Sequence, residues 1–410
     1  MLANILGVVL FALGICISVA LHEAGHMVTA KMFGMKVRRY FIGFGPTIFS
    51  FRRGETEYGA KWIPLGGFCD IAGMTALDEV TPDEAPRAMW RFKTWKRTVV
   101  MSAGSITHFI LGLVVLYLMA ITFGLPNLAL NNLDYNKLDP VVGGTSCAHA
   151  ATTLQQLDDV SCPPGALRPA DAGGLKAGDK VLSVNGQPAT SWTGLQQKIQ
   201  SANGPTKFVV QRGDQQVTLT VDVPRLARLG ADNKVSTIGM IGVTPQVPPA
   251  MLHYNGLEAV PATFVFTGDM FAQTAVRLVQ FPERVPGIVS AIFGGERDPN
   301  GPVSVVGASR IGGEAVEQGL WQIFFFLLAS LNFFIGVFNL LPLLPLDGGH
   351  IAVVWYEKVR DWLRGLRGKA AGGPVDYTKL SAITMVLVVI GGGITLLTVT
   401  ADIVNPIRLQ

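Results

Sequence analysis

Four long apolar runs dominate the hydropathy pattern of this chain. They fall within residues 1–34, 98–124, 320–350 and 381–405. Each is long enough to cross, as a helix, a hydrocarbon layer roughly 30 Å thick. Gly-Leu-Pro closes the second run, and Pro342 and Pro345 interrupt the third, because proline cannot continue a helix. The pattern predicts a polytopic α-helical membrane protein with about four transmembrane helices.

Residues 35–97, between the first two runs, follow a different pattern. From 36 to 67, aromatic and β-branched residues are punctuated by glycines, which predicts a membrane-associated β-hairpin. Its free edge would offer an incoming peptide a strand to pair with, and an ordinary surface hairpin is the alternative. Residues 81–97 mix tryptophan and phenylalanine with basic residues, so we expect an interfacial helix there on anionic lipid.

The polar region 125–255 contains the pattern of one small domain, within residues 142–224, that resembles a PDZ domain. Its features are Gly-Leu at 174–175, Gly-Asp at 178–179, Asn-Gly at 185–186, a helix over 191–201 and strands over 206–223. Such a domain either binds peptide tails or excludes bulky substrates as a size filter. Little in the sequence marks a carboxylate-binding loop, which favours the filter. The next stretch, 256–319, is expected to lie along the outer membrane surface.

The distribution of basic residues predicts the orientation of the spans. Of 33 lysines and arginines, 12 lie within 31–97 and six within 358–379, whereas only 14 are spread over 125–319. The positive-inside rule then places 35–97 and the basic loop 351–380 in the cytoplasm. Both termini and the PDZ-like region would face outward, in the multi-pass topology of a plasma-membrane protein.

Cysteine usage and net charge agree with this orientation. Cys147 and Cys162 both fall in the outward region, where an oxidising exterior favours a disulfide over two unpaired thiols. The net charge of +4 is small and spread along the chain, so a nucleic-acid partner is not indicated.

Candidate chemistry lies inside the first apolar run, in the pentad His-Glu-Ala-Gly-His at 22–26. A spacing of four places the imidazoles of His22 and His26 on one helix face, where they can bind one Zn²⁺. Glu23 then sits beside the metal as a candidate general base. Ionisable groups are costly at membrane depth, so this cluster indicates a functional site opening toward the cytoplasm.

A catalytic zinc needs a third protein ligand, and Asp347 is the candidate. It is the carboxylate at the cytoplasmic end of the third run, and the surrounding prolines and glycines free the backbone to turn it inward. An Asp that only caps the end of the span is the alternative. His350 remains a competing ligand or an outer-shell group. Nitrogen and oxygen donors point to Zn²⁺ rather than to iron or copper.

The pentad, together with Asn-x-x-Pro at 339–342 and Leu-Asp-Gly at 346–348, resembles the site-2 protease family of intramembrane zinc metalloproteases. Ile-Gly-Phe-Gly-Pro at 42–46 and Ile-Pro-Leu-Gly-Gly at 63–67 look like its bacterial, PDZ-containing branch, and residues 36–39 and 52–58 are similar to the actinobacterial, mycobacterial type. The resemblance implies regulated intramembrane proteolysis of single-span proteins, such as anti-sigma factors, already trimmed by a site-1-type protease. It further implies zinc ligation by His22, His26 and Asp347, general base catalysis by Glu23, and substrate binding by Asn339.

One position departs from the family pattern. Many relatives open the second span with Gly-Pro and an Asn a few residues on, whereas this chain has His108 after the small run 102–105. The small residues permit close approach to the first span. We expect His108 to be a hydrogen-bonded helix contact, and a metal or proton role as an outer-shell group of the site is the alternative. A non-catalytic PDZ scaffold with a structural zinc is the main alternative function. A transporter is disfavoured because no inverted repeat is evident.

Overall fold

The computed structural model describes residues 1–75, 78–153, 156–157, 162, 165–230, 234–298, 301–373 and 375–409. The expected regions 125–255, 256–319 and 351–380, and the PDZ-like stretch 142–224, each include positions outside these described residues. The chain forms two compact units, one of residues 1–125 with 253–410 and the other of residues 126–252.

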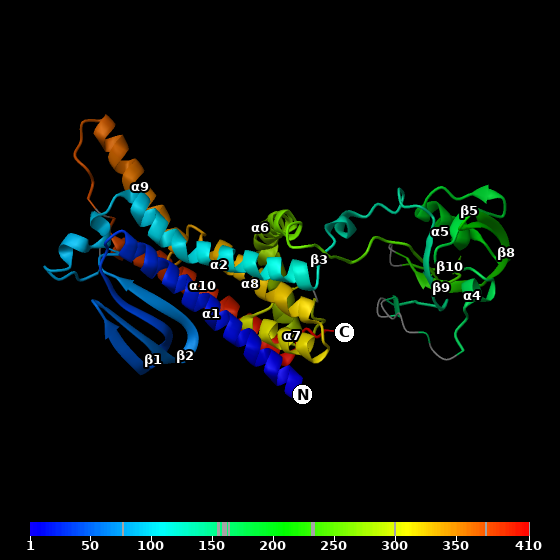
Figure 1. Cartoon of the computed structure of the whole chain (residues 1–410), viewed down its shortest axis with the longest axis horizontal. Helices are drawn as coiled ribbons and strands as arrows, with labels where there is room; N and C mark the ends of the chain where they lie inside the picture. Colours follow the sequence, from blue (N-terminus) through cyan, green and yellow to red (C-terminus); the bar gives the residue numbers. More distant parts are fainter. Residues whose placement is uncertain are drawn as a thin grey trace. The chain divides into compact units, whose positions relative to one another are not determined.

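Four helices of the first unit are long and apolar enough to cross a membrane, as the sequence predicts. They are α1 (Leu2–Met32), α2 (Thr94–Thr122), α8 (Trp321–Asn339) and residues 380–404 of α10 (Tyr377–Val404). In the bundle, α1 packs against α2, and α2 packs against α8 (Figure 1). The four candidate membrane spans are therefore confirmed.

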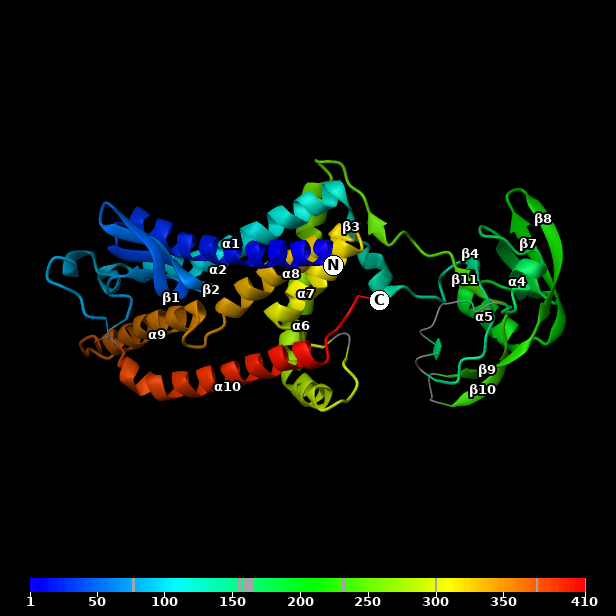
Figure 2. The same cartoon turned by 90° about the horizontal axis from the view of Figure 1, so that it is seen from below.

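The described residues of this unit also form the helices α6 (Ala259–Ile292), α7 (Val305–Glu317) and α9 (Asp347–Leu366). Helix α7 lies against α1, and α10 contacts α6 and α7 (Figure 2). The third span ends at Asn339, just before Pro342 and Pro345, because proline cannot continue a helix. Much of the basic loop 351–380 is helical, because α9 buries His350 and Val354 on one face and packs against α2.

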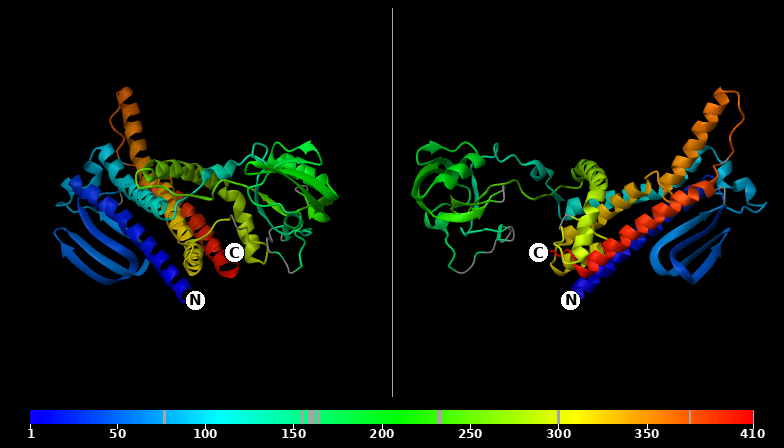
Figure 3. Two further views of the ribbon diagram at one scale, coloured as in Figure 1. Left: turned by 45° about the vertical axis from the view of Figure 1, so that its right-hand side comes forward. Right: turned by 180° about the vertical axis from the view of Figure 1, so that it is seen from behind.

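The hairpin expected after α1 is present as β1 (Val37–Arg53) and β2 (Thr56–Ile71), which turn at Gly54 with φ +64°. Both strands are bent, and Figure 3 shows them curving beside α1. The middle of β1, residues 39–42, pairs with residues 57–60 of β2 on one side and with residues 67–70 on the other. Residues 67–70 therefore form an edge of the folded hairpin.

One interaction anchors the hairpin to α1. The hydroxyl of Tyr40 in β1 donates a hydrogen bond to the backbone carbonyl of Ala20, at 2.7 Å. Burial raises the pKa of Tyr40 to about 12, so the hydroxyl keeps the proton that it donates. The hairpin is thereby fixed beside the segment of α1 that contains the pentad.

The prediction of an interfacial helix over residues 81–97 is wrong. This stretch contains only two short 3₁₀ turns, η1 (Ala85–Arg87) and η2 (Met89–Arg91), before α2 begins at Thr94. Its backbone bonds to other segments: Met89 N–H donates to the carbonyl of Ala72, at 2.8 Å. Arg38 of β1 donates a hydrogen bond to the carboxylate of Glu84, and this bond holds residues 81–91 against β1. The same interaction lowers the pKa of the Glu84 carboxyl to about 2.

The second unit is built on a four-stranded sheet with α5 (Trp192–Ser201) beside it. The strands lie in the order β6 (Gln187–Pro188), β5 (Lys180–Val184), β7 (Gly204–Arg212) and β8 (Gln215–Val223). Buried Phe208, Val210 and Val221 form its core with Leu195 of α5. The strand after the Gly-Asp turn, the Asn-Gly hairpin and the helix all occur where the sequence places them. The remaining described elements between residues 125 and 252 are β3 (Leu125–Pro126), η3 (Leu128–Asn132), β4 (Val142–Thr145), α4 (Pro169–Ala172), β9 (Arg225–Leu229), β10 (Val235–Gly239), β11 (Val243–Pro245) and β12 (Met251–Leu252).

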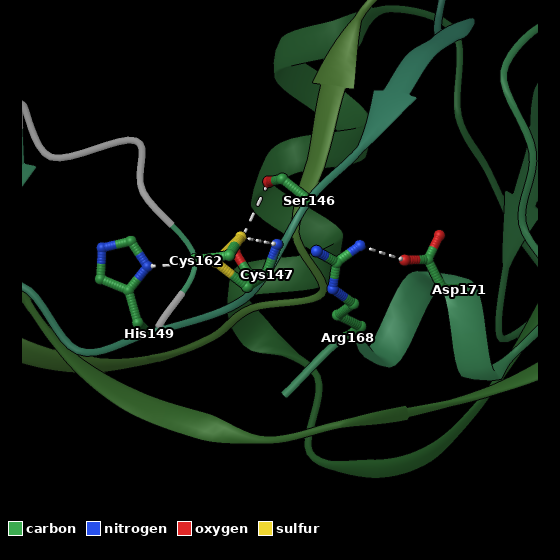
Figure 4. The surroundings of a disulfide bond; sticks show 6 residues. All are labelled: Ser146, Cys147, His149, Cys162, Arg168 and Asp171. Atoms are coloured by element: carbon green, nitrogen blue, oxygen red, sulfur yellow. Dashed lines mark hydrogen bonds and ion pairs between the residues drawn. A yellow bond between two sulfur atoms is a disulfide. The ribbon is translucent and has the colours of Figure 1, made fainter. Parts of the chain in front are cut away.

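A disulfide joins Cys147 and Cys162, 15 residues apart, with His149 beside it (Figure 4). We expect the double variant Cys147→Ser/Cys162→Ser to destabilise the second unit by about 3 kcal/mol, because a loop of this length is freed in the unfolded chain. Hydrogen exchange of residues 126–252 in the full-length protein measures this, with residues 1–125 as the internal reference. Unchanged exchange in the variant would contradict the expectation.

Candidate active site

Helix α1 brings two imidazoles together on one face. His22 and His26, one turn apart, are each only 7% exposed. Their Nε2 atoms lie 3.2 Å from each other and their ring centroids 4.8 Å apart. The helix geometry alone produces this pair, since a spacing of four returns side chains to the same face.

Asp347 joins the two histidines from far along the chain. It is the first residue of α9, and the loop that follows α8 directs it back into the bundle. Its Oδ2 atom lies 3.4 Å from the Nε2 of His22 and 3.4 Å from the Nε2 of His26. Among the described residues, these three side chains form a group close enough to share one metal ion.

The triangle of donor atoms fits a zinc ion. Zinc binds imidazole nitrogen and carboxylate oxygen at about 2.0–2.1 Å, so two ligands of a tetrahedral site are separated by roughly 3.3 Å. The three measured separations, 3.2, 3.4 and 3.4 Å, match this value. Asp347 Oδ2 is also buried without a hydrogen-bond partner in the described part of the chain, as a metal-binding oxygen would be before its ion is added. Three protein ligands leave the fourth position open for chemistry.

An outer hydrogen bond orients His26. Its Nδ1 donates to the backbone carbonyl of Val100 in α2, at 2.7 Å. The proton on Nδ1 leaves the Nε2 lone pair free to face the metal position. His22 lacks such a partner, since its Nδ1 is buried and forms no hydrogen bond with any described residue.

Glu23 lies where α1 meets the edge of the hairpin. A Cβ added at Gly67 would stand 3.1 Å from the Cγ of Glu23, so β2 passes directly over this side chain. Residues 67–70, at the edge of the hairpin, therefore lie next to the side chain of Glu23.

Gly104 of α2 permits the histidines to occupy their positions. A Cβ there would stand 2.4 Å from the Nε2 of His26 and 2.5 Å from the Cε1 of His22. The small run 102–105 thus allows the close approach of α2 to α1 that its composition predicts.

We expect Gly104→Ala to displace both imidazoles and to weaken zinc binding and activity together, because overpacking typically costs about 1–3 kcal/mol. Zinc content and peptide cleavage of the purified variant measure this. Gly391→Ala in α10 is the matched control, since nothing lies within 4 Å of the added Cβ. Equal zinc content in Gly104→Ala and the control would contradict the packing explanation.

The remaining predicted site residues have different surroundings. His350 is buried three residues beyond Asp347 and stacks on Tyr377 at 6.1 Å, outside the group of three donor side chains. Asn339 is the half-buried last residue of α8. His108 is buried and hydrogen-bonds the amide of Asn332, at 2.9 Å.

Sequence reasoning missed Asn332. The signal was present, because Asn332 is an amide within the otherwise apolar α8, two helical turns before Asn339. It also missed Val100, for which no sequence signal exists, because any residue supplies a backbone carbonyl.

Comparisons with known proteins agree with this geometry. The family model for peptidase family M50 matches residues 10–382. The chain is 48% identical to the zinc metalloprotease Rip1 of Mycolicibacterium smegmatis, over 98% of both chains. It is 46% identical to Rip1 of Mycobacterium tuberculosis, over 98% of both. It is 29% identical to the metalloprotease MmpA of Caulobacter vibrioides, over 85% of both. With this match over most of its length, the chain belongs to peptidase family M50, the site-2 protease family.

Proposed function

We propose that this chain cleaves transmembrane segments of single-span membrane proteins, after another protease has trimmed their outer domains. The chain is a multi-pass membrane protein and a zinc metalloprotease, in keeping with its family and the names of its relatives. One observation supports the proposal most: the donor atoms of His22, His26 and Asp347 meet in a buried triangle beside Glu23. Anti-sigma factors are substrates of the expected kind.

The proposed roles follow from the chemistry of each side chain. His22, His26 and Asp347 would hold Zn²⁺. When bound, the ion polarises the peptide carbonyl and makes an attacking water more acidic. Glu23 takes the proton from that water and delivers it to the leaving amine. The helices around the site keep bulk water away, which strengthens the electrostatic interactions within it.

Substrate presentation is assigned to the hairpin edge. A peptide bond within a helix is shielded by its own hydrogen bonds, so the substrate must unwind before Glu23 can act. Residues 67–70 lie at an edge of the hairpin next to Glu23, which supports strand pairing with an extended substrate at this place. Asn339, at the end of α8, would hold the unwound substrate backbone.

The proposal also covers the orientation of the protein in the membrane and the role of the second unit. The lysine and arginine distribution supports outward-facing termini and an active site that opens toward the cytoplasm. The four-stranded sheet and the helix α5 support a PDZ-like second unit, which we assign to the outer side. There it would act as a filter against substrates with bulky outer domains.

The test uses the full-length protein in lipid vesicles with two single-span substrates that share one transmembrane segment. One carries a short outer tail, and the other carries a folded outer domain. We expect cleavage within the shared segment of the short-tailed substrate and resistance of the other. If the zinc-loaded protein cleaves neither substrate while its outer unit binds peptides, the non-catalytic scaffold is the better explanation.

A further inference from the structure

Two buried polar side chains connect α2 and α8 next to the metal ligands. His108 of α2 and Asn332 of α8 are each only 1% exposed. The Nδ1 of His108 and the Oδ1 of Asn332 are 2.9 Å apart. Burying this pair among apolar side chains costs free energy unless all its polar atoms find partners. The metal-ligand roles proposed above do not account for it.

The amide of Asn332 has a defined orientation. Its Nδ2 donates to the backbone carbonyl of Leu328, at 2.8 Å, so its Oδ1 is the atom that faces His108. An amide oxygen only accepts, and therefore the Nδ1 of His108 must carry a proton. A neutral His108 then has its lone pair on Nε2, which is a hydrogen-bond acceptor.

The Nδ1 of His22, a buried nitrogen without a hydrogen-bond acceptor among the described residues, belongs to the ring next to His108. If His22 binds zinc through Nε2, its Nδ1 carries a proton, yet that buried nitrogen has no partner among the described residues. The ring centroids of His22 and His108 are 5.0 Å apart. Two imidazoles joined by an N–H···N bond of about 3 Å also have centroids roughly 5 Å apart. The rings are therefore close enough for such a bond to form in the zinc-loaded protein, although the two nitrogens are not hydrogen-bonded in this structure.

We propose that Asn332 and His108 are positioning residues for the zinc ligand His22. In the zinc-loaded protein, Nδ1–H of His22 donates to Nε2 of His108, whose own Nδ1–H donates to Asn332. The chain of hydrogen bonds holds Nε2 of His22 toward the metal. His108 thus does for His22 what the carbonyl of Val100 does for His26. This inference depends on the metal site of the proposed function.

The first test measures the rate of zinc loss to a chelator from the full-length protein. We expect His108→Leu to lose zinc about 10–100-fold faster than wild type, as is typical when an outer partner of a ligand is removed. His108→Asn, which restores an amide acceptor, should recover most of the difference. Ser105→Ala is the matched control, because Ser105 is also a fully buried polar residue of α2 and its hydroxyl has no partner among the described residues. Wild-type zinc retention in His108→Leu would overturn the proposal.

A second measurement needs no substitution. The chain has six histidines, so selective ¹⁵N-histidine labelling gives few signals. In the zinc-loaded protein we expect protons on the Nδ1 of both His22 and His108, and a coupling across the hydrogen bond from His22 Nδ1 to His108 Nε2. A proton on His108 Nε2 instead of Nδ1 would overturn the proposal.

The two proposals fail in distinguishable ways. If His22→Ala retains zinc, the assignment of the metal site is wrong, and the inference about His108 is then also wrong. If His22→Ala loses zinc while His108→Leu and Asn332→Leu both keep it at the wild-type rate, only the positioning role is wrong. A purely structural role would lower the melting temperature of the zinc-free and zinc-loaded forms equally, whereas positioning lowers mainly that of the loaded form.

Discussion

Glu23→Gln is expected to abolish peptide cleavage while the protein keeps its zinc. The substitution preserves the shape of the side chain but removes the carboxylate that takes up the proton, and general base catalysis contributes on the order of 10²–10⁴-fold to rate. Glu23 is not one of the three donor side chains, so metal affinity should change little. Zinc stoichiometry and cleavage of a transmembrane peptide, measured on one preparation, give both quantities.

Glu283→Gln is the control for Glu23→Gln, since Glu283 is an exposed residue of α6. It should leave both zinc content and cleavage at wild-type values. Substantial turnover by Glu23→Gln would remove Glu23 from the role of general base. Loss of zinc in that variant would instead show that Glu23 supports the metal site.

Asp347→Ala is expected to lose both zinc and activity. The carboxylate is the third corner of the donor triangle, and its removal leaves two ligands, fewer than a catalytic zinc site requires. Because outer-shell partners alone change metal affinity by about 10–100-fold, loss of a direct ligand should weaken binding on the order of 100-fold or more. Titration with a competing zinc chelator measures the affinity.

His350→Ala separates the two candidate ligands at the start of α9. The structure places His350 outside the group of three donor side chains, so this variant should retain zinc. If His350→Ala loses zinc and Asp347→Ala keeps it, the third ligand has been assigned to the wrong residue.

The local features of this protein follow from its amino-acid sequence alone. Apolar runs of sufficient length predict the spans, because a chain in hydrocarbon must satisfy its backbone hydrogen bonds within a helix. A spacing of four residues places His22 and His26 on one face, because the helix repeats every 3.6 residues. Glycines among β-branched and aromatic residues predict the hairpin, since this composition suits bent, paired strands.

The way in which distant segments meet depends on how the helices pack in the folded chain. The position of Asp347 depends on how α8, its proline-broken loop and α9 pack against α1 and α2, which no local periodicity encodes. Gly104 is a second example. A Cβ at this position would clash with the imidazoles of His22 and His26, and this clash arises only because α2 packs against α1. The bond between His108 and Asn332 joins two helices far apart in the sequence. The sequence therefore names all three candidate ligands, local geometry pairs two of them, and only packing brings the third and the orienting groups to the site.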